Sequence, residues 1–106
     1  MTRLFLRLSG SLEKVAQRVG AVALPKFHAE LRDGLNLGGG DYFKFAGEGV
    51  EILLVCNDAD HAEVFEPERA DFPFYCYVWK GDDVMLESMQ DALSAAGIEN
   101  EIEEEA

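Results

Sequence analysis

Short apolar segments with a two-residue period recur along the chain, and turns rich in glycine or acidic residues separate them. In residues 2–9, Leu4, Leu6 and Leu8 alternate with Arg3 and Arg7. This alternation is typical of a β-strand with one buried face. Residues 41–46, 50–57 and 72–80 also have strand character, and the second of these is nearly all apolar, as in a central strand covered on both faces. The chain is therefore expected to fold around a sheet.

Two other segments have the three-to-four-residue period of amphipathic helices. The first follows Ser11, a suitable N-cap, and is expected to end near Gly20 or one turn later, before Pro25. The second follows Asp82 and Asp83, whose carboxylates favour the positive end of a helix dipole. The apolar positions of the two helices are Leu12, Val15, Ala16 and Val19, and then Met85, Leu86, Met89, Ala92, Leu93 and Ala96.

Residues 25–34 fit either a helix or a strand. Pro25 suits a first helical turn and Gly34 a helix end. Against this, Phe27, Ala29 and Leu31 alternate with polar residues, which is the period of a strand. We favour the strand because the alternation is unbroken, and the glycines at 38–40 then provide a loop.

The glycines of the turn Gly47-Glu48-Gly49 fit a tight hairpin between two of the strands. The resulting order is β-α-β-β-β-β-α, with a short additional strand at residues 98–102 left open. We expect an α+β fold, a two-layer sandwich in which a mainly antiparallel sheet carries two helices on one face. Residues 1–98 are expected to form this single domain, and residues 99–106 a solvated acidic tail.

The charge of the chain is strongly asymmetric. Twenty-one acidic and nine basic residues give −12, divided into +3 for residues 1–44 and −15 for residues 45–106. Such a field repels nucleic acid and anionic lipid, so neither is an expected partner. No apolar stretch is long enough to span a membrane, and Arg3 and Arg7 interrupt the apolar start that a secretory signal needs. We therefore expect a cytoplasmic chain whose charge favours a basic protein or a cation.

Five aromatic residues lie within residues 72–79, FPFYCYVW. Alternation along the strand divides the segment into one set of Phe74, Cys76 and Val78 and a second set of Tyr75, Tyr77 and Trp79. The first set suits the core beneath the helices. The second lies on the uncovered face of a two-layer sandwich, where it either packs within its own chain or contacts another protein or a second copy.

The segment NDADHAE at residues 57–63 gathers carboxylates and one histidine. Ala62 stands where a calcium loop requires glycine, and a single histidine among carboxylates is a poor ligand set for structural zinc. We expect a solvated acidic loop here rather than a metal site.

No combination of residues predicts catalysis. Cys56 and Cys76 lie in apolar runs, where thiols are usually buried, and no motif pairs either of them with His28 or His61. The GGGD run lacks the lysine and the strand-to-helix context of a phosphate loop. We expect neither enzyme activity nor a cofactor, and a small enzyme or cation-binding module that uses residues 57–63 is the alternative.

The whole pattern resembles the small acidic immunity proteins of bacterial polymorphic and contact-dependent toxin systems. The resemblance rests on the GGGDYF entry into a strand, the VEILLVC strand, the acidic loop, the FPFYCYVW strand and the final amphipathic helix. It implies a non-enzymatic protein that blocks the basic active site of a toxin, through electrostatic attraction followed by aromatic contacts.

The residues expected to attract this partner are Asp58, Asp60, Glu63, Glu66 and Glu68. Tyr75, Tyr77 and Trp79 are expected to anchor it if their face of the sheet is open. The rival hypothesis is a homo-oligomeric structural or regulatory domain in which a second copy buries that face.

Overall fold

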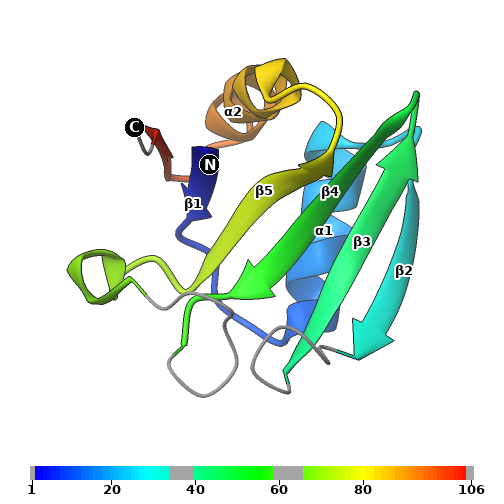
Figure 1. Cartoon of the computed structure of the whole chain (residues 1–106). Helices are drawn as coiled ribbons and strands as arrows, with labels where there is room; N and C mark the ends of the chain where they lie inside the picture. Colours follow the sequence, from blue (N-terminus) through cyan, green and yellow to red (C-terminus); the bar gives the residue numbers. More distant parts are fainter. Residues whose placement is uncertain (1, 34–39, 59–65, 105–106) are drawn as a thin grey trace.

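In its computed structural model, the protein is a six-stranded antiparallel sheet with two helices on one face (Figure 1). The strands are β1 (Thr2–Leu6), β2 (His28–Asp33), β3 (Asp41–Gly47), β4 (Val50–Cys56), β5 (Phe74–Lys80) and β6 (Asn100–Glu104), and the helices are α1 (Leu12–Ala23) and α2 (Val84–Ala95). Their order across the sheet is β2-β3-β4-β5-β1-β6. The structure describes residues 2–33, 40–58 and 66–104. The predicted α+β class and the predicted order of strands and helices are confirmed.

Local signals define both ends of α1. The Ser11 hydroxyl oxygen accepts a hydrogen bond from the backbone N–H of Lys14 at 3.3 Å, which satisfies one of the donors left open at a helix start. Val15, Ala16 and Val19 are buried against the sheet. Of the two predicted ends, near Gly20 or one turn later, the structure has the later one, because the helix stops at Ala23.

The start of α2 is capped by Asp82, whose Oδ1 accepts a hydrogen bond from the backbone N–H of Val84 at 3.0 Å. At the other end Gly97 has a φ of 79°, the left-handed conformation that glycine adopts readily. The N–H of Ile98 then donates to the carbonyl of Leu93 at 2.9 Å, as in a Schellman motif. Within the described residues, no helix has the length and apolar character needed to cross a membrane.

The ambiguous segment after Pro25 is a strand. Residues 28–33 form β2 at one end of the sheet, and Leu31 pairs with Phe43 of β3. The hairpin between β3 and β4 also matches its prediction, because Gly47 pairs with Val50 across a two-residue turn. Both turn residues have positive φ, 53° at Glu48 and 78° at Gly49. This is the conformation of the type I′ turns that match the twist of a hairpin.

The main core lies between the sheet and the helices. Its fully buried side chains include Leu4, Leu6, Val15, Val19, Phe45, Ile52, Leu54, Cys76, Leu86, Met89 and Leu93. Full burial of one such leucine or isoleucine contributes about 1.5–3 kcal/mol. Phe74 and Cys76 belong to this core, with Val78 packed at its margin, as alternation along β5 predicts.

The C-terminal segment is the clearest correction to the predicted domain organisation. Residues 100–104 are not a solvated tail but form β6, which pairs with β1 along its whole length. A terminal strand had been left open at 98–102, and the structure places it two residues later. Leu4 of β1 lies opposite Ile102, which packs against the main core. The pairing with β1 and the contact of Ile102 with the core thus outweigh the acidic composition of the segment.

Candidate partner-binding surface

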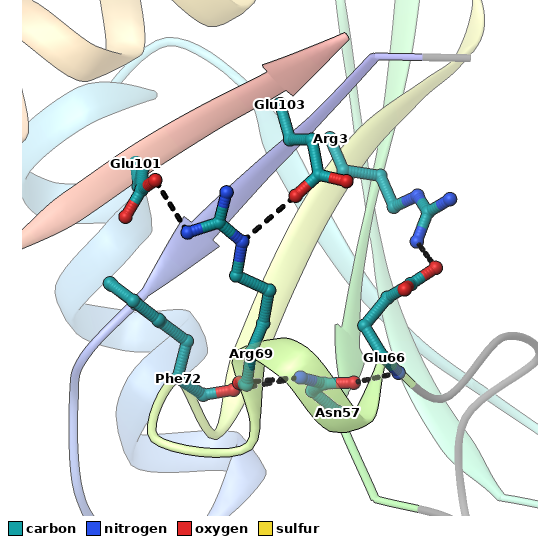
Figure 2. Close-up of polar contacts among 7 residues, drawn as sticks. All are labelled: Arg3, Asn57, Glu66, Arg69, Phe72, Glu101 and Glu103. Atoms are coloured by element: carbon teal, nitrogen blue, oxygen red, sulfur yellow. Dashed lines mark hydrogen bonds and ion pairs between the residues drawn. The ribbon is translucent and has the colours of Figure 1, made fainter. Parts of the chain in front are cut away.

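Residues 66–72, which we call the covering segment, lie beside the start of β5 (Figure 1), and Phe72 at their end packs on the sheet face opposite the helices. Buried Asn57, directly after β4, holds the segment in place. Its Nδ2 donates to the carbonyls of Arg69 and Phe72 at 3.0 and 3.1 Å. Its Oδ1 accepts the backbone N–H of Glu66 at 3.0 Å (Figure 2). One amide therefore satisfies three backbone groups of the covering segment.

Arg69 joins the covering segment to β6. Figure 2 shows its guanidinium between two carboxylates, and Nε donates to Glu103 at 2.8 Å while NH1 donates to Glu101. These hydrogen bonds from Arg69 to Glu103 and Glu101 raise the pKa of the guanidinium. The same group lies 5.7 Å from the centre of the Phe5 ring. The acidic residues of the C-terminal segment therefore have an internal structural partner.

Two N-terminal arginines bind the covering segment from the other side. Arg3 is only 2% exposed and pairs with Glu66. Arg7 pairs with Asp71, and its guanidinium lies 4.7 Å from the centre of the Phe72 ring. A guanidinium as deeply buried as that of Arg3 is costly without such a carboxylate. The sequence signal for these contacts was the alternation of Arg3 and Arg7 with leucines in residues 2–9.

The covering segment changes the role of two of the expected anchors. Tyr75 is 1% exposed and Tyr77 is 2% exposed, so of the two alternatives for these rings the structure has packing within their own chain. The Tyr75 ring centre lies 5.7 Å from that of Phe5 and 6.0 Å from that of Tyr77. A second core on this face consists of Phe5, Leu53, Val55, Phe72, Tyr75 and Tyr77. Neither tyrosine ring is available to a partner in this structure.

Trp79 is the expected anchor that does lie exposed, at 62% of its side-chain surface. It sits at a bulge near the end of β5, because Val78 pairs with Ile52 while Lys80 pairs with Glu51. The ring therefore lies beyond the second core. A large exposed indole of this kind is the side chain most often found at the centre of protein interfaces.

The acidic residues expected to attract a partner are divided by the structure. Asp58 and Glu68 are exposed. Glu66 is only partly exposed and is used within the chain, in its ion pair with Arg3. Asp60 and Glu63 lie outside the described residues.

The structure does not bring the exposed acids and the exposed indole together. Asp58 follows the end of β4, where Cys56 pairs with Phe74. Trp79 lies near the opposite end of the same strand pair, beside Glu51. About five residues of strand separate these two ends, roughly 17 Å. Asp58 and Trp79 therefore do not belong to one contiguous contact surface.

A second acidic group lies much closer to Trp79. A hollow of about 250 Å³ at the start of α2 is lined by Asp82, Asp83, Glu87 and Glu104, with Thr2, Val84, Leu86 and Ile102. Among the described residues no basic side chain lines it. Asp82 follows Trp79 by three residues, which limits their Cα separation to about 11 Å. We call Trp79, Asp82, Asp83, Val84 and Glu87 the β5–α2 corner.

Sequence reasoning missed this corner because its acids had another explanation. Asp82 and Asp83 were interpreted as a helix cap, and Glu104 as part of a tail. Asp82 does cap the helix, yet both residues remain exposed beside the large exposed side chain of Val84. The available signal was the acidic pair three residues after a tryptophan.

The described residues offer little for catalysis or metal binding. No group of three histidine, cysteine or acidic side chains among them has the geometry to hold a metal ion. Burial raises the pKa of the Cys76 thiol to about 12 and also raises that of Cys56. Both groups are therefore protonated thiols at neutral pH, which are poor nucleophiles. Most of the NDADHAE segment lies outside the described residues.

Comparison with known proteins finds no match to a family model, to a curated protein or to a solved structure.

Proposed function

We propose that this chain is a non-enzymatic acidic domain that binds another protein, most concretely an immunity protein that neutralises a basic bacterial toxin. The observation that carries the proposal is the β5–α2 corner, where the exposed Trp79 precedes by three residues Asp82, one of the four carboxylates that line a hollow at the start of α2. An apolar anchor with acidic neighbours is complementary to an apolar patch bordered by lysine or arginine.

The use of basic side chains inside the chain supports the same conclusion. Within the part of the chain that the structure describes, five basic side chains pair with carboxylates of their own chain, and these are Arg3, Arg7, Arg32, Lys44 and Arg69. The hydrogen bond from Lys44 lowers the pKa of Glu51, as expected for a stable ion pair. These cations are paired within the chain, so the electrostatic field that a partner encounters is that of the net charge of −12.

The proposed mechanism has two steps. The acidic field, including that of Asp58 and Glu68, first raises the rate at which a basic partner is encountered. The partner then docks at the β5–α2 corner, where Trp79 enters an apolar site and the carboxylates of Asp82 and Asp83 meet basic side chains. If that partner is a nuclease-type toxin, an acidic protein over its cationic cleft prevents the anionic substrate from entering.

The test first asks whether a gene adjacent to that of this chain encodes a basic polypeptide, which is then used as the binding partner. Co-expression is expected to protect cells from that polypeptide, and surface plasmon resonance is expected to show association that slows by at least about tenfold from low to high salt. Trp79→Ala should raise the dissociation constant by about 30-fold or more, since a central indole contributes at least about 2 kcal/mol. The double variant Asp82→Asn/Asp83→Asn should slow association and leave dissociation nearly unchanged.

Leu31→Ala provides the matched control, because it also truncates an exposed apolar side chain, but at the far edge of the sheet. It should bind like the parent chain. Binding that is indifferent to ionic strength, or equal loss of affinity in Trp79→Ala and Leu31→Ala, would contradict the proposal. So would the absence of any complex with the neighbouring basic polypeptide.

A further inference from the structure

We propose that the chain also forms a symmetric homodimer, in which β2 pairs antiparallel with β2 of a second copy about a twofold axis at Leu31. β2 is an end strand of the sheet, and all six of its residues are exposed. Leu31 is 48% exposed, although it lies on the face that the helices cover. This interface is distinct from the β5–α2 corner.

Hydrogen-bond alternation leaves donors and acceptors open along the outer side of β2. The Asn57 N–H donates to the Pro73 carbonyl at 2.8 Å, so the odd-numbered residues of β4 bond to β5 and the even-numbered ones to β3. Even-numbered residues of β4 lie opposite odd-numbered residues of β3, so the even-numbered residues of β3 bond to β2. These lie opposite even-numbered residues of β2, and the even-numbered residues of β2 therefore bond to β3. The backbone groups of Ala29, Leu31 and Asp33 then point away from the sheet, ready to pair with another strand.

The charges on β2 are complementary to themselves in one register. With the twofold axis at Leu31, Glu30 lies opposite Arg32 of the second copy, and the same pair repeats on the other side of the axis. A shift of the axis by one residue places Glu30 opposite Glu30, or Arg32 opposite Arg32. Opposite charges across a strand pair stabilise it and like charges destabilise it. The sequence of β2 therefore selects both a second copy as its partner and the register of pairing.

The charged side chains of β2 are available for this exchange. Arg32 Nε lies 3.1 Å from Glu30 Oε1 within the same strand, and both side chains are exposed. An exposed pair of this kind contributes little to stability, so each side chain can bond across the interface at small cost.

Apolar surface accompanies the charge pairs. Leu31 lies opposite Phe43 of β3, on the helix-covered face, and alternation places Leu31 of the second copy on that same face. An apolar cleft of about 430 Å³ lies nearby between α1 and the β2–β3 edge, with Ala29 and Phe43 in its wall. Pairing of the two strands brings the two leucines together beside the two clefts and removes them from water.

The other end of the sheet does not offer this self-complementarity. β6 carries Glu101, Glu103 and Glu104, so antiparallel pairing of two copies places carboxylates opposite carboxylates in every register. Such charge is a common protection of an edge strand against pairing. β2 lies three strands from β5, roughly 14 Å away, so a dimer through β2 leaves the β5–α2 corner accessible.

Sedimentation velocity across the micromolar to millimolar range tests the dimer. The parent chain is expected to shift from monomer to dimer with concentration. Glu30→Arg leaves two arginines opposite two arginines, and Arg32→Glu leaves two glutamates opposite two glutamates. Each single variant should raise the dimer dissociation constant by about tenfold or more.

An equimolar mixture of the two single variants should form a heterodimer, because both cross-strand pairs are then of opposite sign. The double variant Glu30→Arg/Arg32→Glu should dimerise like the parent chain, which also shows that neither change prevents folding. Asp91→Arg, an equal change of charge on the exposed side of α2, is the matched control and should leave dimerisation unchanged. A parent chain that stays monomeric at millimolar concentration, or a mixture that fails to associate, would overturn the inference.

Discussion

Asn57 illustrates how a single buried amide determines the shape of one sheet face. It follows an apolar strand in which nothing marks it as structural, yet it bonds to three backbone groups of the covering segment. Those groups belong to residues 9 to 15 positions further along the chain, so no local period reports the contact. Phe72, at the end of that segment, packs in the same second core as Tyr75 and Tyr77.

We expect Asn57→Ala to lower the free energy of unfolding by about 3 kcal/mol, because it leaves buried backbone groups without partners. Asn57→Asp should be worse than Asn57→Ala, since it keeps the acceptor for Glu66 but turns a carboxylate toward the carbonyls of Arg69 and Phe72. Urea denaturation measures both. Equal stability of Asn57→Asp and the parent chain would contradict the assigned hydrogen bonds.

At the scale of elements, β6 shows that composition and structure can point in different directions. Three glutamates in five residues suggest a solvated segment, but alternation places Glu101 and Glu103 on the face where Arg69 lies. Ile102, between them, faces the main core. A strand of this composition is stable only where a cation and a partner strand are already in place.

Deletion of residues 99–106 tests the difference between a strand and a tail. It removes the pairing with β1 and the carboxylates that bind Arg69, so we expect a loss of several kcal/mol of stability or a chain that does not fold. Glu104→Lys, at an exposed position of the same strand, should change stability by no more than about 0.5 kcal/mol. Thermal denaturation followed by circular dichroism compares them, and a truncated chain as stable as the parent would support a tail instead.

The β3–β4 hairpin provides a second prediction at this scale. Glu48 has a φ of 53°, which asparagine tolerates better, so Glu48→Asn should raise the free energy of unfolding by about 0.5 kcal/mol. Gly49 has a φ of 78° and open space around it, so Gly49→Ala should lower stability by about 1 kcal/mol through backbone conformation alone. Chemical denaturation measures both changes in the free energy of unfolding. A destabilising Glu48→Asn together with a stabilising Gly49→Ala would exclude this turn geometry.

At the scale of the whole molecule, the charge pattern concerns recognition more than stability. Exposed ion pairs contribute about 0–1 kcal/mol each, so the arginine–carboxylate contacts at the surface do not by themselves hold the fold together. Their effect is on the external field, because each ion pair is locally neutral and the excess of carboxylates, −12 for the whole chain, determines the field. The β5–α2 corner lies in that field with an exposed indole.

Fluorescence quenching measures this field, because Trp79 is the single tryptophan of the chain. The indole should emit like a solvent-exposed one, and caesium ions should quench it at least about twofold more efficiently than iodide at low ionic strength, since a negative field concentrates cations. The difference should shrink at high salt as the field is screened. Asp82→Asn/Asp83→Asn should reduce it, and equal quenching by both ions would show that the corner is not acidic in solution.

The candidate site was predictable from the sequence in part. Trp79 is exposed, whereas Tyr75 and Tyr77, which alternation predicts for the same face, are buried. The exposure of each ring depends on which residues pack over it. Contacts of Arg3 and Asn57 with residues more than nine positions away position those residues. Asp82 and Asp83 were recognised only for their effect on a helix.

The sequence by itself determined the elements of this protein, because strand alternation, helical spacing, the Ser11 cap and the hairpin glycines each act over a few neighbouring residues. It also determined the sign of the outer field, which is a sum over residues. Only the tertiary structure decided which surface is open. The return of residues 66–72 onto the sheet and the pairing of β6 with β1 are long-range contacts, and their free energies depend on burial and partners that no local pattern contains.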